Sequence, residues 1–399
     1  MDVELESIKI KNFKSLEDVI LKFRDLTIIV GANSSGKSNS LKALFFLKFL
    51  VENGDSRYLE EIEKLVKIDS EEKKIEFSMN LKIYLEDNEK IKMAEYRVTL
   101  SRKNDDKFSC SRELLKIGSI KVIDVTNGTG IVRDDNGENK QIYHSKQGGL
   151  ALRTAGDFGD KPLTSKISDF IKKWRFYNLD PEIIRNQNIY NDTDIRERYK
   201  LSSLFDTQGQ RLQNSIIFWF THKPEILLNF NREVYDCLGI KLEICKNNDN
   251  PEIYVIEKNN LKVPFLDISD GTVRMIAYCA LLMFPGLRTL VGIEEPERNL
   301  HPAVLGEVAS LLKRLSQQNQ VVITTHSSQF LDCFSLEEIQ NDVSVLLLTQ
   351  KSNLGTQVIP LDELGKKRED LLEWMQDFGV GSAIYHSNLL QECLEGENA

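Results

Sequence analysis

The feature that most constrains this chain is a glycine-rich segment that follows a short apolar run near the N-terminus. Leu26–Val30 is largely apolar and β-branched, which predicts a buried strand that ends at Gly31. Gly31–Ser38 fits the pattern G-x-x-x-x-G-K-[ST]. The apolar residues that follow recur at helical spacing as far as about Val51. Strand, glycine loop and helix in this order predict a phosphate-binding P-loop.

The chemistry of this loop predicts ATP and Mg²⁺ as ligands. Gly31 and Gly36 let the backbone curl, so that its N–H groups point at phosphate oxygens at the positive end of the following helix. Lys37 would neutralise the β- and γ-phosphates, and the Ser38 hydroxyl would ligate Mg²⁺. The predicted nucleotide contacts in this segment are Gly31, Asn33, Ser34, Gly36, Lys37, Ser38 and Asn39.

Composition narrows the class of protein. The 399 residues carry a net charge of −9, with 41% hydrophobic and 28% charged residues, so the chain as a whole is not a polybasic nucleic-acid binder. Its six cysteines form no C-x-x-C pair, which favours neither a zinc site nor a disulfide framework. The N-terminus is acidic and lacks a signal h-region, and no apolar run is long enough to span a bilayer. We therefore expect a soluble, cytoplasmic protein with no membrane partner.

The middle of the chain predicts a second layer of structure. Residues 75–85, 96–100 and 120–125 alternate apolar with polar side chains, as in an antiparallel sheet with one wet face. Residues 126–162 are rich in Gly, Asp and Asn and predict turns or a loop. Further predicted elements are a short helix at 60–68, a helix at 167–174, a long helix at 212–238 and a β-meander over 240–265.

From residue 266 onwards, apolar strands alternate with helices, which is typical of a parallel α/β sheet. The strand at 289–293 ends in Glu294 and Glu295, and the strand at 321–325 ends in His326. Ligands bind at the carboxyl ends of such strands. A Walker B interpretation gives Glu294 to the Mg²⁺ shell and Glu295 to the attacking water, with His326 at the γ-phosphate. Considered without the other motifs, Glu294 and Glu295 could instead form a salt-bridged pair at a strand end, and His326 could have a purely structural role.

The order of the motifs resembles a known family. After the P-loop come Leu-x-x-Ser269-Asp-Gly-Thr, Glu294-Glu-Pro-Glu, Asn299-Leu-His-Pro and Thr325-His-Ser. This order is similar to that of an ABC-type ATPase head of the SMC/RecF/OLD branch. It more closely resembles the bacterial AAA-type ATPases of that branch that stand alone or accompany an anti-phage effector. The implied fold class is α/β, a P-loop NTPase with an ABC-type head, a mixed β-sheet subdomain and a helical and β insertion.

The resemblance implies that two heads enclose two ATP molecules. Ser269, Asp270 and Gly271 of one head would cap the γ-phosphate bound by the P-loop of the other. Asn299 would belong to the loop that crosses between the two sites. The implied partners are a homodimer or higher homo-oligomer and a separate effector, a nuclease or toxin. The activity implied is hydrolysis of ATP to ADP and phosphate.

Two alternatives stay open at this stage. One is a RecF-like DNA-repair ATPase that binds duplex DNA, and the other is a nucleotide-sensing scaffold that holds a toxin inactive. An intrinsic nuclease is not expected, because the 73 residues after His326 contain no Asp-x-Asp pair. The tail is expected either to pack on the head or to dock a partner. The sequence suggests an N-terminal lobe at 1–125, an insertion at 126–265, a C-terminal lobe at 266–350 and a tail at 351–399.

Overall fold

A computed structural model describes the chain as two compact units. The first comprises residues 1–175, 287–294 and 318–399, and the second comprises residues 176–286 and 295–317. The chain passes from the first unit to the second within strand β10 (Arg175–Tyr177). It does so again between Glu294 and Glu295. The described residues are 2–53, 74–85, 90–102, 108–145, 149–154, 159–186, 206–247, 250–283, 288–351, 355–365 and 369–386.

The first unit contains the predicted parallel sheet. Strands β14, β15, β3, β16 and β17 lie side by side in that order. The first four are parallel, and β17 pairs antiparallel with β16. Every residue of β3 and β15 is buried, as expected for strands covered on both faces. The bounds are Leu290–Glu294 (β14), Gln320–Thr325 (β15), Leu26–Gly31 (β3), Val343–Lys351 (β16) and Gly355–Pro360 (β17), and the P-loop helix α1 is Lys37–Asn53.

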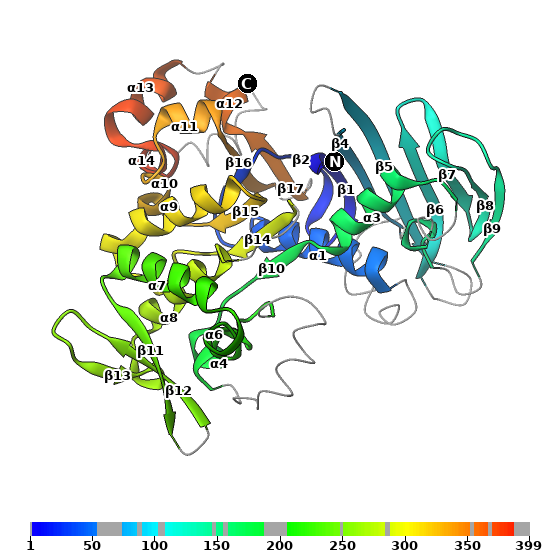
Figure 1. Cartoon of the computed structure of the whole chain (residues 1–399). Coiled ribbons are helices and arrows are strands. Elements are labelled where there is room, and N and C mark those ends of the chain that lie inside the picture. The colour runs from blue at the N-terminus through cyan, green and yellow to red at the C-terminus, as the bar shows by residue number, and fades with distance from the viewer. Residues whose placement is uncertain are drawn as a thin grey trace. The chain divides into compact units, whose positions relative to one another are not determined.

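The first unit also contains a larger antiparallel sheet, with the order β2-β1-β4-β5-β6-β7-β8-β9 (Figure 1). Its strands β1 and β4 alternate buried residues with partly or fully exposed ones, as the period-two sequence pattern predicts. Phe13, Phe46 and Phe77 form an aromatic cluster beneath it, with ring centroids 5.8 to 6.1 Å apart. The bounds are Asp2–Phe13 (β1), Leu16–Lys22 (β2), Lys74–Tyr84 (β4), Ile91–Arg102 (β5), Phe108–Ile117 (β6), Ile120–Thr126 (β7), Thr129–Val132 (β8) and Gln141–His144 (β9).

The prediction of turns or a loop across residues 126–162 was wrong in part. Asn127 and Gly128 both have positive φ, 48° and 76°, and Thr126 pairs with Thr129 across them. They form the two-residue turn of a hairpin, for which Asn-Gly is the favoured sequence. The Gly- and Asn-rich composition therefore marked the connection between β7 and β8 and not an absence of strands. The short helices here are η1 (Ala151–Arg153) and α3 (Pro162–Lys172).

The second unit is mainly helical. The single helix expected over 212–238 is two helices, because Pro224 cannot donate a backbone hydrogen bond and is placed at the start of a new helix. Gly239, with φ of 67°, ends the second of them. The predicted β-meander is present as β11, β12 and β13. The bounds are Pro181–Arg185 (α4), Leu212–His222 (α6), Pro224–Leu238 (α7), Lys241–Asn247 (β11), Asn250–Ile256 (β12), Lys262–Pro264 (β13), Phe265–Asp267 (η3), Asp270–Leu281 (α8), Pro302–Val304 (η4) and Leu305–Ser316 (α9).

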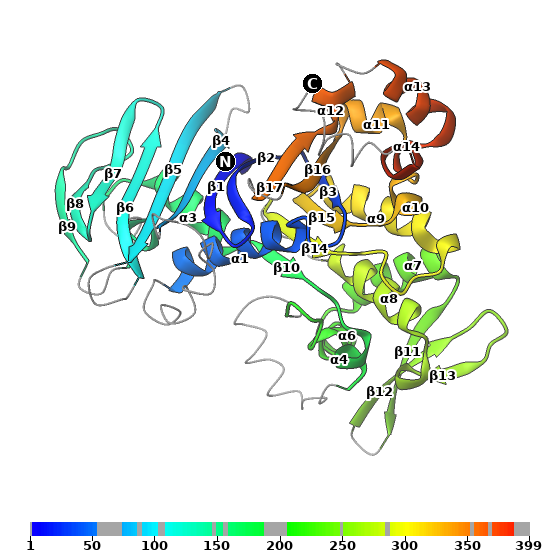
Figure 2. The ribbon, with the colours of Figure 1, turned by 180° about the vertical axis from the view of Figure 1, so that it is seen from behind.

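Short helices of the first unit gather beside β16 and β17 at the C-terminal end of the chain (Figures 1 and 2). They are Ser328–Leu331 (α10), Leu336–Asn341 (α11), Leu361–Gly365 (α12), Glu369–Phe378 (α13) and Val380–His386 (α14). The helix expected at 60–68 lies outside the described residues. In the described part of the chain, no helix is both long and apolar enough to cross a lipid bilayer.

Candidate nucleotide-binding site

The P-loop of the first unit has the backbone that anion binding requires. Between β3 and α1 the chain turns through positive φ at Ser34 (66°) and Gly36 (105°). Lys37 is buried, and its Nζ donates to the carbonyl oxygens of Gly31 (2.8 Å) and Ala32 (2.9 Å). The lysine is thus held back against its own loop at the N-terminus of α1, where backbone N–H groups and the helix dipole favour an anion.

The two glycines of the motif are required by space as well as by dihedral angle. A Cβ at Gly31 would overlap the carbonyl oxygen of Leu348 on the neighbouring strand. A Cβ at Gly36 would lie 2.5 Å from Thr356 Oγ1. The loop is therefore pressed against β16 and β17 on one side. A cradle with this backbone and a lysine at its end fits the phosphates of a nucleotide.

A small hydrogen-bonded cluster supports the back of the loop. Thr356 Oγ1 donates to the carbonyl oxygen of Ser35 at 3.0 Å and lies 3.0 Å from Ser15 Oγ. Asn39, predicted as a nucleotide contact, donates from its amide to Ser15 Oγ at 2.9 Å. Sequence reasoning missed Ser15 and Thr356, since they come from the β1–β2 turn and from β17, far from the motif in the chain.

The strand register brings Glu294 and His326 to the edge of the sheet at which the P-loop begins. Glu294 is paired with Thr324 on β15, and Thr325 is paired with Val30 on β3. His326 follows Thr325 directly and is exposed. Its turn is fixed by Ser327, whose N–H donates to Thr325 Oγ1 and whose Oγ caps α10. Glu294 and Gly31 are thus the last residues of β14 and β3, and His326 is the first residue after β15.

The residues predicted to bind Mg²⁺ at this edge offer a small set of oxygen ligands. Ser38 and Glu294 are both partly exposed and offer one hydroxyl and one carboxylate. Across the described residues, no group of three or more His, Cys, Asp or Glu side chains is arranged to hold a metal ion. This donor set fits Mg²⁺, which is commonly bound through one or two protein oxygens together with water and phosphate oxygens.

The second unit holds the signature segment. Ser269 is the N-cap of α8, and its Oγ accepts from the N–H of Thr272 at 3.2 Å. Asp270 forms an ion pair with Arg185 at 2.7 Å, and Arg185 also donates to the carbonyl oxygen of Ile268 at 2.6 Å. Arg185 therefore anchors the segment from α4. No local sequence signal links it to Asp270, because 85 residues separate them.

The turn that carries Glu295 lies in the same unit and has a strained backbone. Glu295 has φ of 45° and Asn299 has φ of 61°, the left-handed region that most side chains avoid. The carbonyl oxygen of Glu295 accepts from the N–H of Arg298 at 3.1 Å. A Cβ at Gly271 would lie 3.5 Å from the carbonyl oxygen of Asn299, so the signature glycine and the predicted crossing residue are neighbours. Strained non-glycine residues cluster at functional sites.

A tyrosine that sequence reasoning missed joins the signature helix to this turn. Tyr278, on α8, donates from its hydroxyl to the carbonyl oxygen of Pro296 at 3.1 Å. Burial raises the pKa of Tyr278 to about 12, while the nearby Arg274 guanidinium opposes the increase. Arg274, Tyr278 and Glu297 are all buried. The spacing of Arg274 and Tyr278, four residues apart on one helix, is the only signal that could have suggested the cluster.

The fold is similar to that of solved SMC heads. An SMC head bound to the C-winged-helix domain of ScpA has a TM-score of 0.52 and 17% identity, over 91% of this chain and 99% of that chain. An Smc head domain with an extended coiled coil, bound to the C-terminal domain of ScpA derived from Pyrococcus furiosus, has a TM-score of 0.50 and 15% identity, over 93% and 100%. At these identities the similarity establishes the fold alone.

The sequence profile of one family matches residues 26–332, well over half of the chain. The matched span runs from the P-loop strand to beyond the histidine turn. The family is described as "AAA domain, putative AbiEii toxin, Type IV TA system". The chain, a P-loop protein with the fold of an SMC-type head, belongs to this AAA domain family.

Proposed function

We propose that this protein binds ATP with Mg²⁺ and hydrolyses it to ADP and phosphate. The observation that carries the proposal is the strand register of the first unit. It ends β3, β14 and β15 at one edge of the sheet, with the P-loop, Glu294 and the His326 turn following from them. A lysine-bearing phosphate cradle beside a carboxylate and a histidine is the arrangement that phosphoryl transfer to water uses.

Each residue has a definite role in this proposal. Lys37 leaves its loop carbonyls to neutralise the β- and γ-phosphates, and the P-loop N–H groups hold their oxygens. Ser38 and Glu294 would hold Mg²⁺, which would supply positive charge to neutralise the phosphates. Glu295 orients a water molecule and accepts its proton as that water attacks the γ-phosphorus. His326 donates a hydrogen bond to the γ-phosphate.

The proposed assembly is an ATP-gated dimer. Ser269, Asp270 and Gly271 of one head cap the γ-phosphate bound by the P-loop of the other, at the positive end of α8. Asp270 would add unfavourable negative charge there, and its ion pair with Arg185 offsets part of that charge. Asn299 belongs to the loop that passes between the two sites.

We propose that the closed and open dimers act as a switch for a separate effector, a nuclease or toxin, in anti-phage defence. Two observations support a partner. The solved heads that share this fold are bound to domains of ScpA, and the description of the family names a toxin–antitoxin system. ATP binding and hydrolysis change which surfaces of a dimer are accessible, so that the nucleotide state controls the partner.

The test is the mass of the protein in solution with and without ATP and Mg²⁺. Glu295→Gln keeps the shape of the side chain but cannot accept a proton, so we expect it to bind ATP, turn over very slowly and accumulate as a stable dimer. Lys37→Ala, the matched control, should remain at its nucleotide-free mass because phosphate binding is lost. A mass that does not respond to ATP in either variant contradicts the ATP-gated dimer, and a Glu295→Gln protein with wild-type turnover contradicts the assigned base.

A further inference from the structure

Helix α13, at the C-terminal end of the first unit, exposes two stacked aromatic side chains. Trp374 and Phe378 are 43% and 63% exposed, and their ring centroids lie 5.5 Å apart. The other two tryptophans of the chain, Trp174 and Trp219, are buried at 0% and 2%. Exposed aromatic pairs are uncommon on a protein surface that has no partner, and tryptophan is enriched at the centres of protein interfaces.

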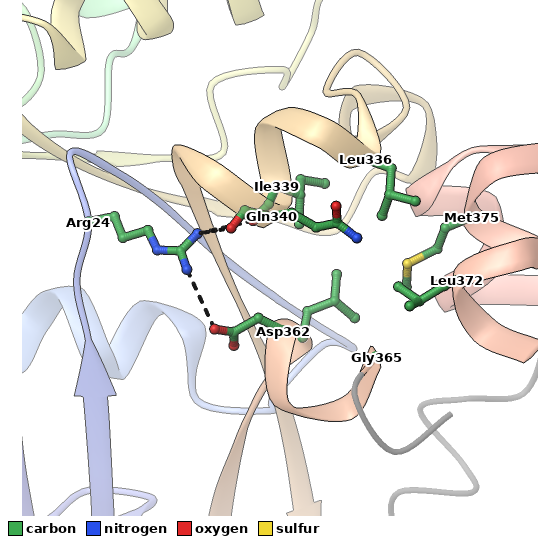
Figure 3. Close-up of a pocket in the computed structure, with 9 residues that line it drawn as sticks. Arg24, Leu336, Ile339, Gln340, Asp362, Gly365, Leu372 and Met375 are labelled. Carbon is green, nitrogen blue, oxygen red and sulfur yellow. Dashed lines mark hydrogen bonds and ion pairs between the residues drawn. The ribbon is translucent and has the colours of Figure 1, made fainter. Parts of the chain in front are cut away.

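The two rings are exposed even though a neighbouring face of α13 is packed against the unit. Leu371 and Met375, on the neighbouring stripe of α13, are buried. Leu372 and Met375 line a cavity of 290 Å³ between α11, α12 and α13, together with Leu336, Ile339 and Leu361 (Figure 3). Arg24 closes one side of this cavity through an ion pair with Asp362 at 3.5 Å. One face of α13 is thus held against the unit, and Trp374 and Phe378 lie outside that face.

An acidic row lies beside the two rings. Asp370, Glu373 and Asp377 are all exposed and follow one another at spacings of three and four, which places them on one stripe of a helix with about 3.6 residues per turn. Residues 369–378 contain no lysine or arginine. The basic run 366–368 precedes the helix and lies outside the described residues, whereas Glu373 and Asp377 lie on α13 itself, beside the rings.

The negative charge and the exposed rings of α13 determine which kind of partner can bind there. An acidic row repels nucleic acid and anionic lipid. It attracts a protein segment that presents arginine or lysine next to an apolar side chain. Arginine suits the surface best, because its guanidinium can stack on the face of Trp374 while it pairs with a carboxylate.

The same helix is tied to the His326 turn. Asp332, at the end of α10, accepts from the N–H groups of Gly381 (2.7 Å) and Ser382 (3.3 Å) and so caps α14, the helix after α13. A Cβ at Gly381 would overlap the carbonyl oxygen of Ser328, so α14 is pressed directly onto α10. Helix α10 begins two residues after His326. A displacement of α13 and α14 therefore acts on the turn that carries the histidine.

We propose that Trp374, Phe378 and the acidic row of α13 form a docking surface for a basic, apolar-bearing segment of a partner protein. Binding there is transmitted through α14 and α10 to His326. The transmission rests on the proposed ATPase function, whereas the docking does not. The surface would thus be the place at which an effector senses or sets the nucleotide state.

The experiment measures acrylamide quenching of tryptophan fluorescence in the full chain. Since Trp174 and Trp219 are buried, quenching reports Trp374, and Trp374→Phe should remove it. The probe is a tryptophan-free helical peptide with leucines on one face and arginines beside them, compared with the same peptide carrying glutamates in place of arginines. We expect the arginine peptide to shield Trp374 and the glutamate peptide not to, with an affinity that decreases as salt is added.

Matched variants test the acidic row. Asp377→Asn and Gln376→Lys each change the net charge by one unit in the same direction, but only the first removes a member of the row. We expect Asp377→Asn to weaken peptide binding and Gln376→Lys to weaken it much less, because Gln376 lies on the opposite side of α13 from Trp374 and Phe378 at about 100° per residue. Addition of Glu373→Gln to Asp377→Asn should bring the loss of affinity to about tenfold. Equal binding of both peptides, or equal effects of the two kinds of variant, overturns the docking surface.

The quenching experiment gives different results if the tail of the chain or a second copy of the protein covers Trp374 and Phe378. If Trp374 is already shielded in the free chain and a chain ending at His386 exposes it, the tail covers the surface and the proposal is wrong. If shielding instead rises with protein concentration alone, a second copy covers it, and the proposal is again wrong. Peptide binding without any change in ATP turnover overturns the transmission to His326. A wild-type chain that binds the peptide but never hydrolyses ATP refutes the proposed function and leaves the docking surface supported.

Discussion

Replacement of Tyr278 by phenylalanine tests whether helix α8 holds the turn of Glu295 in place. The change removes one oxygen atom and leaves the packing of the ring intact. It deletes the 3.1 Å hydrogen bond from the hydroxyl to the carbonyl oxygen of Pro296. Pro296 follows Glu295, whose φ of 45° is a conformation that needs support from its surroundings. We therefore expect both the second unit and the position of Glu295 to be affected.

The magnitude follows from the burial of both groups. A buried neutral hydrogen bond contributes about 1 kcal/mol net, and a buried carbonyl oxygen left without a donor costs about 1–3 kcal/mol. We expect Tyr278→Phe to lower the free energy of unfolding by about 1–2 kcal/mol. If the turn relaxes so that Glu295 leaves its position, the same free energy sets the upper limit on the loss of kcat, a factor of about 5 to 30.

A pH series gives a second, independent measure of the same residue. The pKa of Tyr278 is about 12 in the folded protein against 10.0 for a free tyrosine. The folded state thus binds more protons than the unfolded state between these values, and stability falls as the pH rises through that window. A difference of this size corresponds to about 3 kcal/mol of stability, which is present below pH 10 and is lost as the pH rises to about 12.

Urea unfolding and steady-state ATPase assays on wild type and Tyr278→Phe are the measurements, with the unfolding series repeated from pH 9 to 12. The variant should lose stability and kcat at neutral pH and should show a shallower decrease of stability above pH 10. If the variant matches wild type in stability and in kcat, the hydrogen bond does not hold the turn. If stability falls but kcat is unchanged, Tyr278 is structural and Glu295 is positioned by other contacts.

Three further substitutions, one of them with a control, test other parts of the site and its support. Glu113→Ala should lower the free energy of unfolding by about 3–5 kcal/mol in urea titrations, because the carboxylate accepts from Tyr96 OH and from the N–H groups of residues 151 and 152 at 2.5–2.9 Å. Gly36→Ala, at φ of 105°, should cost about 1–3 kcal/mol and abolish nucleotide binding in a titration with fluorescent ATP, while Gly306→Ala, in open space on α9, should be neutral or stabilising. Asp332→Ala should raise hydrogen exchange in residues 380–386 by the equivalent of about 1–2 kcal/mol, since α14 loses its cap, with no increase in the strands of either sheet.

The sequence was a good guide wherever function requires a local pattern. The P-loop needs its glycines and lysine at fixed spacing, so the strand, the loop and the helix could all be predicted from Leu26 to Val51. The strand before Glu294 and the strand before His326 are almost entirely buried and consist mainly of apolar residues. Their order along the chain was sufficient to predict the parallel sheet and the edge at which the site lies.

The supports of the site could not be predicted, because they join segments that are distant in the chain. Ser15 and Thr356 meet behind the P-loop, and Arg185 meets Asp270, through contacts that only the fold creates. Local composition also led to a wrong prediction where the same residue types are common in two kinds of structure. Glycine and asparagine indicated a loop after residue 126, yet the same residues are those that a tight hairpin turn needs at Asn127 and Gly128.

The position of Tyr278 suggests how two ATP sites in a dimer could be coupled. In the proposed sandwich, Ser269 at the start of α8 acts on the nucleotide of the partner head, whereas Glu295 acts on the nucleotide of its own head. Tyr278 joins these two elements, since it lies on α8 and bonds to Pro296. Contact with the γ-phosphate in the partner head would shift α8. The hydrogen bond from Tyr278 would pass this shift to the turn that carries Glu295, the proposed base for the nucleotide of its own head. Tyr278→Phe should then weaken cooperativity between the two sites in ATP turnover more than it weakens ATP binding at either one.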